Sequence, residues 1–266
     1  MVLPDIIRSL LENGVHFGHL SKHWNPKMER FIFGKKKNIY IIDLEKTVKE
    51  LESAKQFVKK IAEDEGKILF VSSKRQLKEV IKSLANSCGM PYVVERWVGG
   101  LLTNFSTIQT RIKKFINLME RRNKGEFEKL PPKEVVRLNR ELERMTKMYS
   151  GVVSLNELPR AIYIVDPRRE KTAVREANKL SIPIIALIDT DGDPEVIDYP
   201  IPGNDDAIKS VRFITQQLVD AILEGRKKEE MKEEETRADT SVEEKEAEGV
   251  AFREKNGEEN NKQEGN

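Results

Sequence analysis

Short apolar runs alternate with longer amphipathic segments along most of the chain. Five runs rich in β-branched residues predict strands, at residues 39–42, 68–71, 92–94, 161–165 and 184–188. Apolar residues at helical spacing predict helices at residues 44–65, 74–88, 170–180 and 205–224, the last with Gly225 as its C-cap. Near-continuous apolar strands between amphipathic helices are typical of a parallel sheet with helices on both faces. The pattern therefore predicts a doubly wound α/β domain.

This alternation stops between residues 106 and 149, where two helices are expected on either side of Leu130-Pro131-Pro132. Apolar residues recur there every three or four positions, at Ile108, Ile112, Phe115 and Met119 and at Val135, Leu138, Leu142, Met145 and Tyr149. Such seams predict an antiparallel coiled-coil hairpin. The segment carries 12 Lys/Arg and 6 Asp/Glu, an asymmetry that favours a phosphate-rich partner over a merely solvated face.

Charge divides the chain into a basic body and an acidic tail. Residues 1–225 hold 38 Lys/Arg and 31 Asp/Glu, whereas residues 226–266 hold 9 and 14, although the net charge is +2. We expect an α/β core of residues 1–105 and 150–225, with the inserted hairpin at 106–149. The tail at 226–266 is expected to be disordered, because it has few apolar residues to bury. A basic body points to a nucleic-acid partner.

The single cysteine, Cys88, excludes an internal disulfide framework and is typical of a protein in a reducing compartment. The amino-terminal residues lack the layout of a secretory signal, and no apolar run reaches the ~20 residues that span a bilayer. We therefore expect a soluble, cytoplasmic protein.

The most distinctive loop runs from Arg96 to Phe105, after the strand at 92–94 and before the basic hairpin. Its paired glycines let the backbone turn sharply or approach a partner closely. Arg96 adds a planar, charged guanidinium group, and Trp97 adds a flat aromatic ring suited to stacking. The loop is suited to contact with a polyanion, while a packing role for Trp97 is equally open.

Two patterns suggest enzymes but lack required parts. Asp189-Thr190-Asp191-Gly192-Asp193 follows a strand and resembles the Asp-x-Asp-Gly signature of aspartyl phosphotransferases, in which a carboxylate is the nucleophile. The usual threonine after that glycine is Asp193, and few ordered residues remain for the later motifs, so a turn with self-bonding aspartates fits better. Ser72-Ser73-Lys74-Arg75 follows another strand, but the chain contains neither of the usual glycine-rich phosphate loops.

The three histidines, His16, His19 and His23, lie close together in sequence. Their spacing suggests zinc, but no second group of ligands is evident, and Cys88 lies far away in sequence. Packing or RNA contact is therefore the preferred interpretation, and we expect no metal and no cofactor.

Several motifs occur together and in order over residues 5–225. They are Gly14-Val15-His16-Phe17-Gly18-His19, Trp24-Asn25-Pro26-Lys27-Met28, Ile41-Ile42-Asp43-Leu44, Arg96-Trp97-x-Gly99-Gly100-x-Leu102-Thr103-Asn104, Ile182-Pro183 and Ile201-Pro202-Gly203-Asn204-Asp205-Asp206-Ala207. With this ordered set the chain resembles the family of bacterial small-subunit ribosomal protein number two. The resemblance implies a Rossmann-like or flavodoxin-like α/β domain with an inserted coiled-coil hairpin, and a structural, non-enzymatic role in the small ribosomal subunit. It further implies contacts with 16S ribosomal RNA and with neighbouring proteins, including ribosomal protein number one, and neither a membrane nor a small-molecule substrate.

We expect the RNA contacts to come from basic loops, from the basic hairpin and from two motif residues with stacking or polar side chains. The expected RNA-binding residues are Trp24, Lys27, Lys35, Lys36, Lys37, Lys74, Arg75, Arg96, Asn104, Arg111, Lys113, Lys114, Arg121 and Arg122. Cations of this kind neutralise phosphates with little reading of sequence. The alternatives are an α/β phosphotransferase that uses Asp189 and Asp191, and an RNA or protein adaptor that never joins a ribosome.

Overall fold

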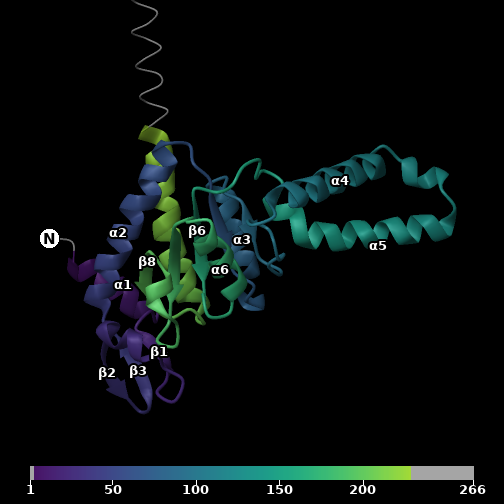
Figure 1. Cartoon of the computed structure of the whole chain (residues 1–266). Coiled ribbons are helices and arrows are strands. Elements are labelled where there is room, and N and C mark those ends of the chain that lie inside the picture. Colours follow the sequence, from purple (N-terminus) through teal and green to yellow (C-terminus); the bar gives the residue numbers. More distant parts are fainter. Residues whose placement is uncertain (1–2, 229–266) are drawn as a thin grey trace, which may run out of the picture.

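The computed structural model describes residues 3–228, and the predicted tail lies outside these residues from position 229 onward. Its central sheet has five strands in the order β5-β4-β6-β7-β8. They are β4 (Ile68–Val71), β5 (Tyr92–Val93), β6 (Ala161–Val165), β7 (Ile184–Ile188) and β8 (Tyr199–Pro202), each parallel to its neighbours. Numbered among themselves, they follow the order 2-1-3-4-5 of flavodoxin-like sheets. The predicted parallel α/β fold is confirmed (Figure 1).

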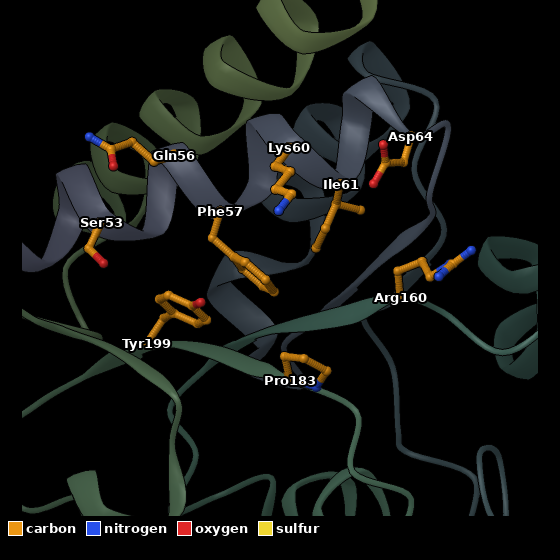
Figure 2. A pocket seen from close by; sticks show the side chains of 9 residues that line it. All are labelled: Ser53, Gln56, Phe57, Lys60, Ile61, Asp64, Arg160, Pro183 and Tyr199. Carbon is orange, nitrogen blue, oxygen red and sulfur yellow. The ribbon is translucent and has the colours of Figure 1, made fainter.

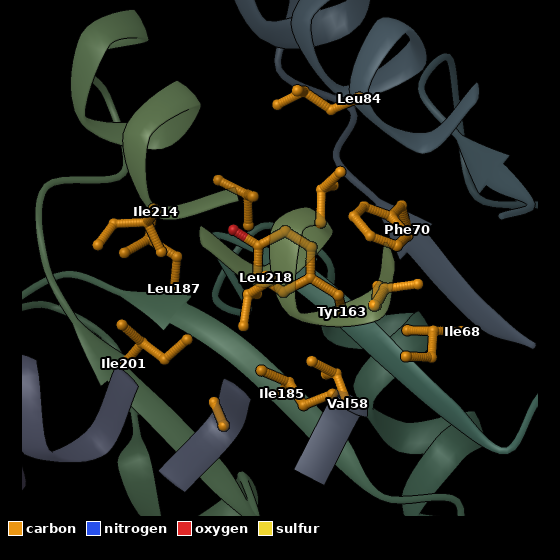
Figure 3. Close-up of a cluster of buried hydrophobic side chains, with 14 of the residues drawn as sticks. Val58, Ile68, Phe70, Leu84, Tyr163, Ile185, Leu187, Ile201, Ile214 and Leu218 are labelled. Carbon is orange, nitrogen blue, oxygen red and sulfur yellow. The ribbon is translucent and has the colours of Figure 1, made fainter. Parts of the chain in front are cut away.

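Alternate residues of the central strands face two separate cores, because successive side chains of a strand point to opposite faces. Phe70 and Tyr163 belong to one core, and Leu69 and Ile162 to the other. The first core is covered by α1 (Leu3–Glu12), α2 (Leu44–Glu63), α3 (Lys78–Ser87) and a helix over residues 208–228, the second by α6 (Lys171–Lys179) and by residues 97–155. Figure 3 shows the first core around Tyr163, whose buried hydroxyl lies 2.9 Å from Thr215 Oγ1. Helices thus cover both faces of the sheet, as predicted.

A second, antiparallel sheet of three strands lies beside the first, with the order β1-β3-β2. Its strands are β1 (Phe17–Leu20), β2 (Ile32–Lys36) and β3 (Ile39–Ile42). Lys37 and Asn38, with φ of 49° and 64°, form the two-residue turn between β2 and β3. The strand predicted at 39–42 is confirmed, but its assignment to the parallel sheet is wrong. So short a turn joins antiparallel neighbours, whereas a parallel partner needs a long crossover.

Two helices form an arm that projects from the body, α4 (Phe105–Asn123) and α5 (Pro132–Tyr149), linked through η3 (Glu126–Lys129) (Figure 1). The arm encloses a row of apolar side chains. Its buried residues are Ile108, Ile112, Phe115, Leu118, Phe127, Leu138, Leu142, Met145 and Tyr149. A pair of helices is therefore observed at this place, while coiled-coil packing between them stays a prediction. Met119 is 40 % exposed, so its expected place in the seam is wrong, because the helix turns Leu118 inward instead.

The helix over residues 208–228 departs from the prediction at both ends. It starts late because Asn204 Oδ1 accepts hydrogen bonds from two of the following backbone N–H groups and holds the chain in a turn. Gly225 is not a C-cap, since the helix continues through it. A Cβ at Gly225 would lie 2.5 Å from the backbone oxygen of Lys59 in α2. The glycine therefore lets the two helices approach closely.

Short helical turns join the longer elements. They are η1 (Pro26–Phe31), η2 (Arg75–Leu77), η4 (Ser150–Val152) and η5 (Pro194–Val196). No helix in the described part of the chain is long and apolar enough to cross a membrane.

Candidate nucleic-acid interface

Three consecutive lysines lie at the tip of the β2–β3 hairpin. Lys35 and Lys36 end β2 and Lys37 begins the turn, and all three are exposed. None of them forms an ion pair with another described residue. Adjacent ammonium groups repel one another, and a polyanion relieves that repulsion. The structure thus keeps the predicted lysines together and open to solvent.

The arm presents cations outward from its apolar row. Arg111, Lys113 and Arg122 are exposed on α4 and form no ion pair within residues 3–228. Two other predicted cations have carboxylate partners, Lys114 with Glu141 at 2.6 Å and Arg121 with Glu126 at 2.9 Å. Such solvent-accessible pairs contribute only about 0.2–1 kcal/mol, so they exchange readily for a phosphate.

Lys74 follows β4 at the carboxyl edge of the central sheet, beside β6, at the point where flavodoxin-like sheets bind ligands. Its ammonium group is part of an internal network. Lys74 Nζ lies 2.6 Å from Asp205 Oδ1, 2.8 Å from Asp206 Oδ1 and 3.0 Å from Asp166 Oδ2. The residue is 8 % exposed and its charge is balanced by these carboxylates, which argues against the predicted contact between Lys74 and RNA phosphate. The neighbouring Arg75 is exposed and remains a candidate.

Burial and charge together set the protonation of this network. Burial acts to lower the pKa of Lys74, but Asp205, Asp206 and Asp166 outweigh it and raise that pKa above its usual value. Burial raises the pKa of Asp205 to about 8, with Asp166 and Asp189 adding to the shift and Lys74 opposing it. The lysine therefore stays charged at neutral pH, and the network has a structural role.

The three histidines have three different surroundings. His19 Nδ1 lies 2.9 Å from Asp189 Oδ2, and this hydrogen bond raises the pKa of His19 to about 9. His16 packs against Phe17 with ring centroids 4.0 Å apart, and burial lowers the pKa of His16. His23 is exposed. Across residues 3–228, no group of three or more His, Cys, Asp or Glu side chains is placed to hold a metal ion.

Each carboxylate in the loop after β7 has a structural partner. Asp189 is 2 % exposed and accepts hydrogen bonds from the N–H and the hydroxyl of Thr190. Asp191 pairs with Arg168, and the side chain of Asp193 caps η5. The loop is the turn with self-bonding aspartates that the sequence favours. It offers no unengaged carboxylate for the nucleophilic attack that a phosphotransferase requires.

The loop between β5 and α4 joins the body to the arm. Arg96 and Asn104 are exposed, whereas Trp97 is 8 % exposed and its Nε1 donates to Glu176 Oε1 at 2.9 Å. Trp97 is therefore a core residue, the second of the two roles open to it. Gly100 has a φ of +86°, a conformation that side chains disfavour. Sequence reasoning missed Glu176, because one glutamate on a distant amphipathic helix carries no local signal.

The segment after β1 is partly committed to packing. Trp24 is half-buried, with its ring centroid 5.0 Å from that of Tyr40 in β3. Lys27 pairs with Asp193 at 2.8 Å and with Glu195 at 2.5 Å, which links η1 to η5. Trp24 and Lys27 therefore both contact other parts of the protein and both remain partly accessible to solvent.

The predicted residues form separate groups, not one patch. In Figure 1 the β2–β3 hairpin and the arm project from different sides of the body. Sequence reasoning also missed Phe33 in β2, which is 79 % exposed. An aromatic residue followed by Gly34 and three lysines was the available signal, since this pattern suits a contact surface better than a core.

Comparison with known proteins identifies the family. The family model described as ribosomal protein S2 matches residues 10–225, which include both the sheets and the arm. The small ribosomal subunit protein uS2 of Dictyoglomus thermophilum is 53% identical over 221 residues, covering 83% of this chain and 90% of that relative. The protein of the same name from Dictyoglomus turgidum shows the same identity, 53% over 221 residues. The chain therefore belongs to the ribosomal protein S2 family.

Proposed function

We propose that this chain joins the small ribosomal subunit by binding 16S ribosomal RNA through two basic projections, the β2–β3 hairpin and the arm. As a member of its family it is a structural constituent of that subunit and not an enzyme. The observation that carries the proposal is the group of exposed hairpin lysines, which have no carboxylate partner among the described residues. Affinity then comes from phosphate neutralisation, with little reading of base sequence.

The arm supports the same mechanism with a second set of cations. Arg111, Lys113 and Arg122 meet phosphates directly, whereas Lys114 and Arg121 first give up exposed carboxylate partners. The arm projects beyond the body (Figure 1), which supports a contact with RNA at a distance from the core surface. Further RNA contacts come from exposed or half-buried residues on the body, without Lys74. These contacts are Trp24, Lys27, Arg75, Arg96 and Asn104.

The salt dependence of binding to 16S ribosomal RNA tests the role of the hairpin. Replacing Lys35–Lys37 by glutamine removes three exposed cations without touching the core. Each lost phosphate contact lowers the slope of log affinity against log salt by about 0.7–0.9, so the slope falls by roughly 2. The matched control replaces Lys49 and Lys60 of α2 and Lys82 of α3, which are likewise exposed and form no ion pair with a described residue, so it changes the net charge equally elsewhere on the body. Equal slopes for the two variants contradict the proposal.

We further propose that the small sheet docks a neighbouring protein, with ribosomal protein number one as the partner that the family resemblance implies. Phe33 is 79 % exposed, and Phe17 and Leu20 on the other edge strand are 47 % and 46 % exposed. Large apolar side chains exposed on both edge strands of so small a sheet are suited to a protein contact. The lysines beside them keep this surface soluble in the absence of the partner.

A binding assay with purified ribosomal protein number one tests this docking surface. Phe33→Ser is expected to weaken binding at least tenfold, while the unfolding midpoint stays unchanged because the side chain packs against little of the protein. Val136→Ser on the arm, where the valine is 50 % exposed, is the matched control and is expected to bind as the wild type does. Wild-type affinity in Phe33→Ser contradicts the assignment.

A further inference from the structure

One carboxylate on α6 accepts five hydrogen bonds from the loop that joins β5 to α4. Glu176 Oε1 accepts from Trp97 Nε1 at 2.9 Å and from the backbone N–H of Gly100 at 2.8 Å. Oε2 accepts from Leu102 N at 3.0 Å and from both N and Oγ1 of Thr103 at 3.2 Å. Glu176 is 7 % exposed and forms no ion pair with another residue in 3–228, so the loop's N–H and O–H dipoles balance its charge.

This arrangement keeps the carboxylate charged. Burial acts to raise the pKa of Glu176, but the hydrogen bonds from Trp97 and the loop amides lower it below its usual value. Hydrogen bonds to an ionised acceptor are stronger than those between neutral groups. Here all the donors lie in the segment between β5 and α4, which contains no strand or helix. Asn104, the residue before α4, gives the helix no side-chain cap. Glu176 does not cap α4 itself, because its donors lie at residues 97–103, before the first helical residue; it fixes the turn that leads into the arm.

We propose that Glu176 is the positioning residue that fixes the direction of the arm relative to the body. Its own helix is anchored, because Ala173 and Ala177 on α6 are fully buried in the core beneath the sheet. The loop that it holds ends directly at Phe105, the first residue of α4. The direction of α4 thus follows from a fixed point on the core.

The returning end of the arm is held by packing and by the hydrogen bond from Gln109 Nε2 on α4 to the backbone oxygen of Asn156, whereas the Glu176 carboxylate gathers five hydrogen bonds at the start of the arm. A Cβ at Gly151, just after α5, would lie 2.2 Å from the backbone oxygen of Tyr92 in β5. That close contact limits how far η4 moves but does not orient a helix. The direction of the arm is a property of the free protein and does not depend on RNA binding.

Pulsed electron paramagnetic resonance on the free, full-length protein measures the direction of the arm. Spin labels are attached through Lys49→Cys on α2 and Lys124→Cys at the far end of α4, both exposed positions. The native Cys88 is buried, and burial raises its thiol pKa to about 11, so it does not react with the label. Glu176→Gln preserves size but places a donating NH₂ group where loop donors point. We expect the distance distribution to become at least twice as wide.

Glu170→Gln is the matched control. Glu170 is 4 % exposed, precedes the same helix and accepts a hydrogen bond from Ser73 N at 2.8 Å, which ties it to the sheet edge and not to the arm. We expect this variant to keep the wild-type distance distribution.

Amide hydrogen exchange measures how well the loop amides that donate to Glu176 are protected. Glu176→Gln is expected to raise the exchange rates of the Leu102 and Thr103 amides at least tenfold, while the Tyr163 amide in the sheet keeps its rate. Trp97→Phe removes one of the five hydrogen bonds and retains a ring, so it is expected to give intermediate widths and rates. It also carries the test if Glu176→Gln fails to fold.

Wild-type distance widths and loop exchange in the substituted proteins overturn the proposal, as does an equal effect of Glu170→Gln. No RNA is present in either measurement. The result is therefore independent of whether the hairpin and the arm bind 16S ribosomal RNA.

Discussion

Replacing Lys74 by methionine removes the cation that holds Asp205, Asp206 and Asp166 together. The three acidic side chains would then face one another, but they differ in exposure. The side chain of Asp206 is 59 % exposed and regains water, whereas that of Asp205 is 3 % exposed and does not. Removing one member of a buried ion pair costs about 3–5 kcal/mol, and the exposure of Asp206 places this case near 3 kcal/mol. The melting temperature should fall by about 6–12 °C.

The loss of stability in Lys74→Met should also grow with pH. In the variant, Asp205 loses the ammonium group that opposes the effect of burial, so its pKa in the folded protein rises further above about 8. A carboxyl group with a raised folded pKa favours folding at low pH and loses that contribution as pH rises through the folded value. The difference in stability between wild type and Lys74→Met is therefore smallest near pH 5 and largest above pH 8.

Urea unfolding at pH 5 and pH 8.5 measures both effects, with Arg75→Met as the matched control. Arg75 is the next residue and is exposed, with no ion pair to a described residue, so its replacement should cost less than about 0.5 kcal/mol. In RNA binding the order of the two effects is reversed, because Arg75→Met is expected to lower the salt slope and Lys74→Met to leave it unchanged. An unfolding free energy no lower for Lys74→Met than for Arg75→Met would refute the reasoning.

Three further outcomes follow from the geometry. Replacing Arg111, Lys113 and Arg122 together by glutamine should lower the salt slope of RNA binding by roughly 2; an unchanged slope would remove the arm from the interface. The pKa of His19 is raised from 6.5 to about 9 in the folded protein, so its contribution to stability is full below pH 6.5 and is lost as pH rises through 9. His19→Gln should flatten that decline in thermal unfolding, and a decline as steep as in the wild type would show that another group causes it. Gly225→Ala places a Cβ 2.5 Å from the Lys59 backbone oxygen and should cost about 1–3 kcal/mol, whereas Gly34→Ala, with open space around it, should be nearly neutral in the same assay.

The central strands were predictable because burial on both faces leaves an unbroken apolar run. The predicted bounds of β4, β6 and β7 match the structure residue for residue. β8 was missed because Tyr199-Pro200-Ile201-Pro202 carries two prolines, which lack an N–H for a neighbouring strand. The two prolines are tolerated because β8 is an edge strand of the sheet. β1 and β2 were missed because each is short, half-exposed and interrupted by a glycine.

Among the site residues, too, those that depend on local sequence were predictable and those that depend on distant partners were not. Exposed cations such as Lys35–Lys37 were predictable, since an unpaired charge needs no partner elsewhere in the chain. Lys74 and Arg75 look alike in sequence, and what separates them is a contact between Lys74 and Asp205, 131 residues away. Glu176 acts on Trp97 across 79 residues. Partners so distant are brought together by the fold and leave no local pattern.

Sedimentation through a sucrose gradient tests the central claim most directly, that the chain is held in the small ribosomal subunit through its hairpin and arm. The wild-type chain is predicted to travel with the small-subunit peak. A variant neutralised at Lys35–Lys37, Arg111, Lys113 and Arg122 should leave that peak as salt rises, while the control with Lys49, Lys60 and Lys82 replaced stays in it. A wild-type chain absent from the small-subunit peak, or a neutralised variant retained there as firmly as the control, would contradict the account.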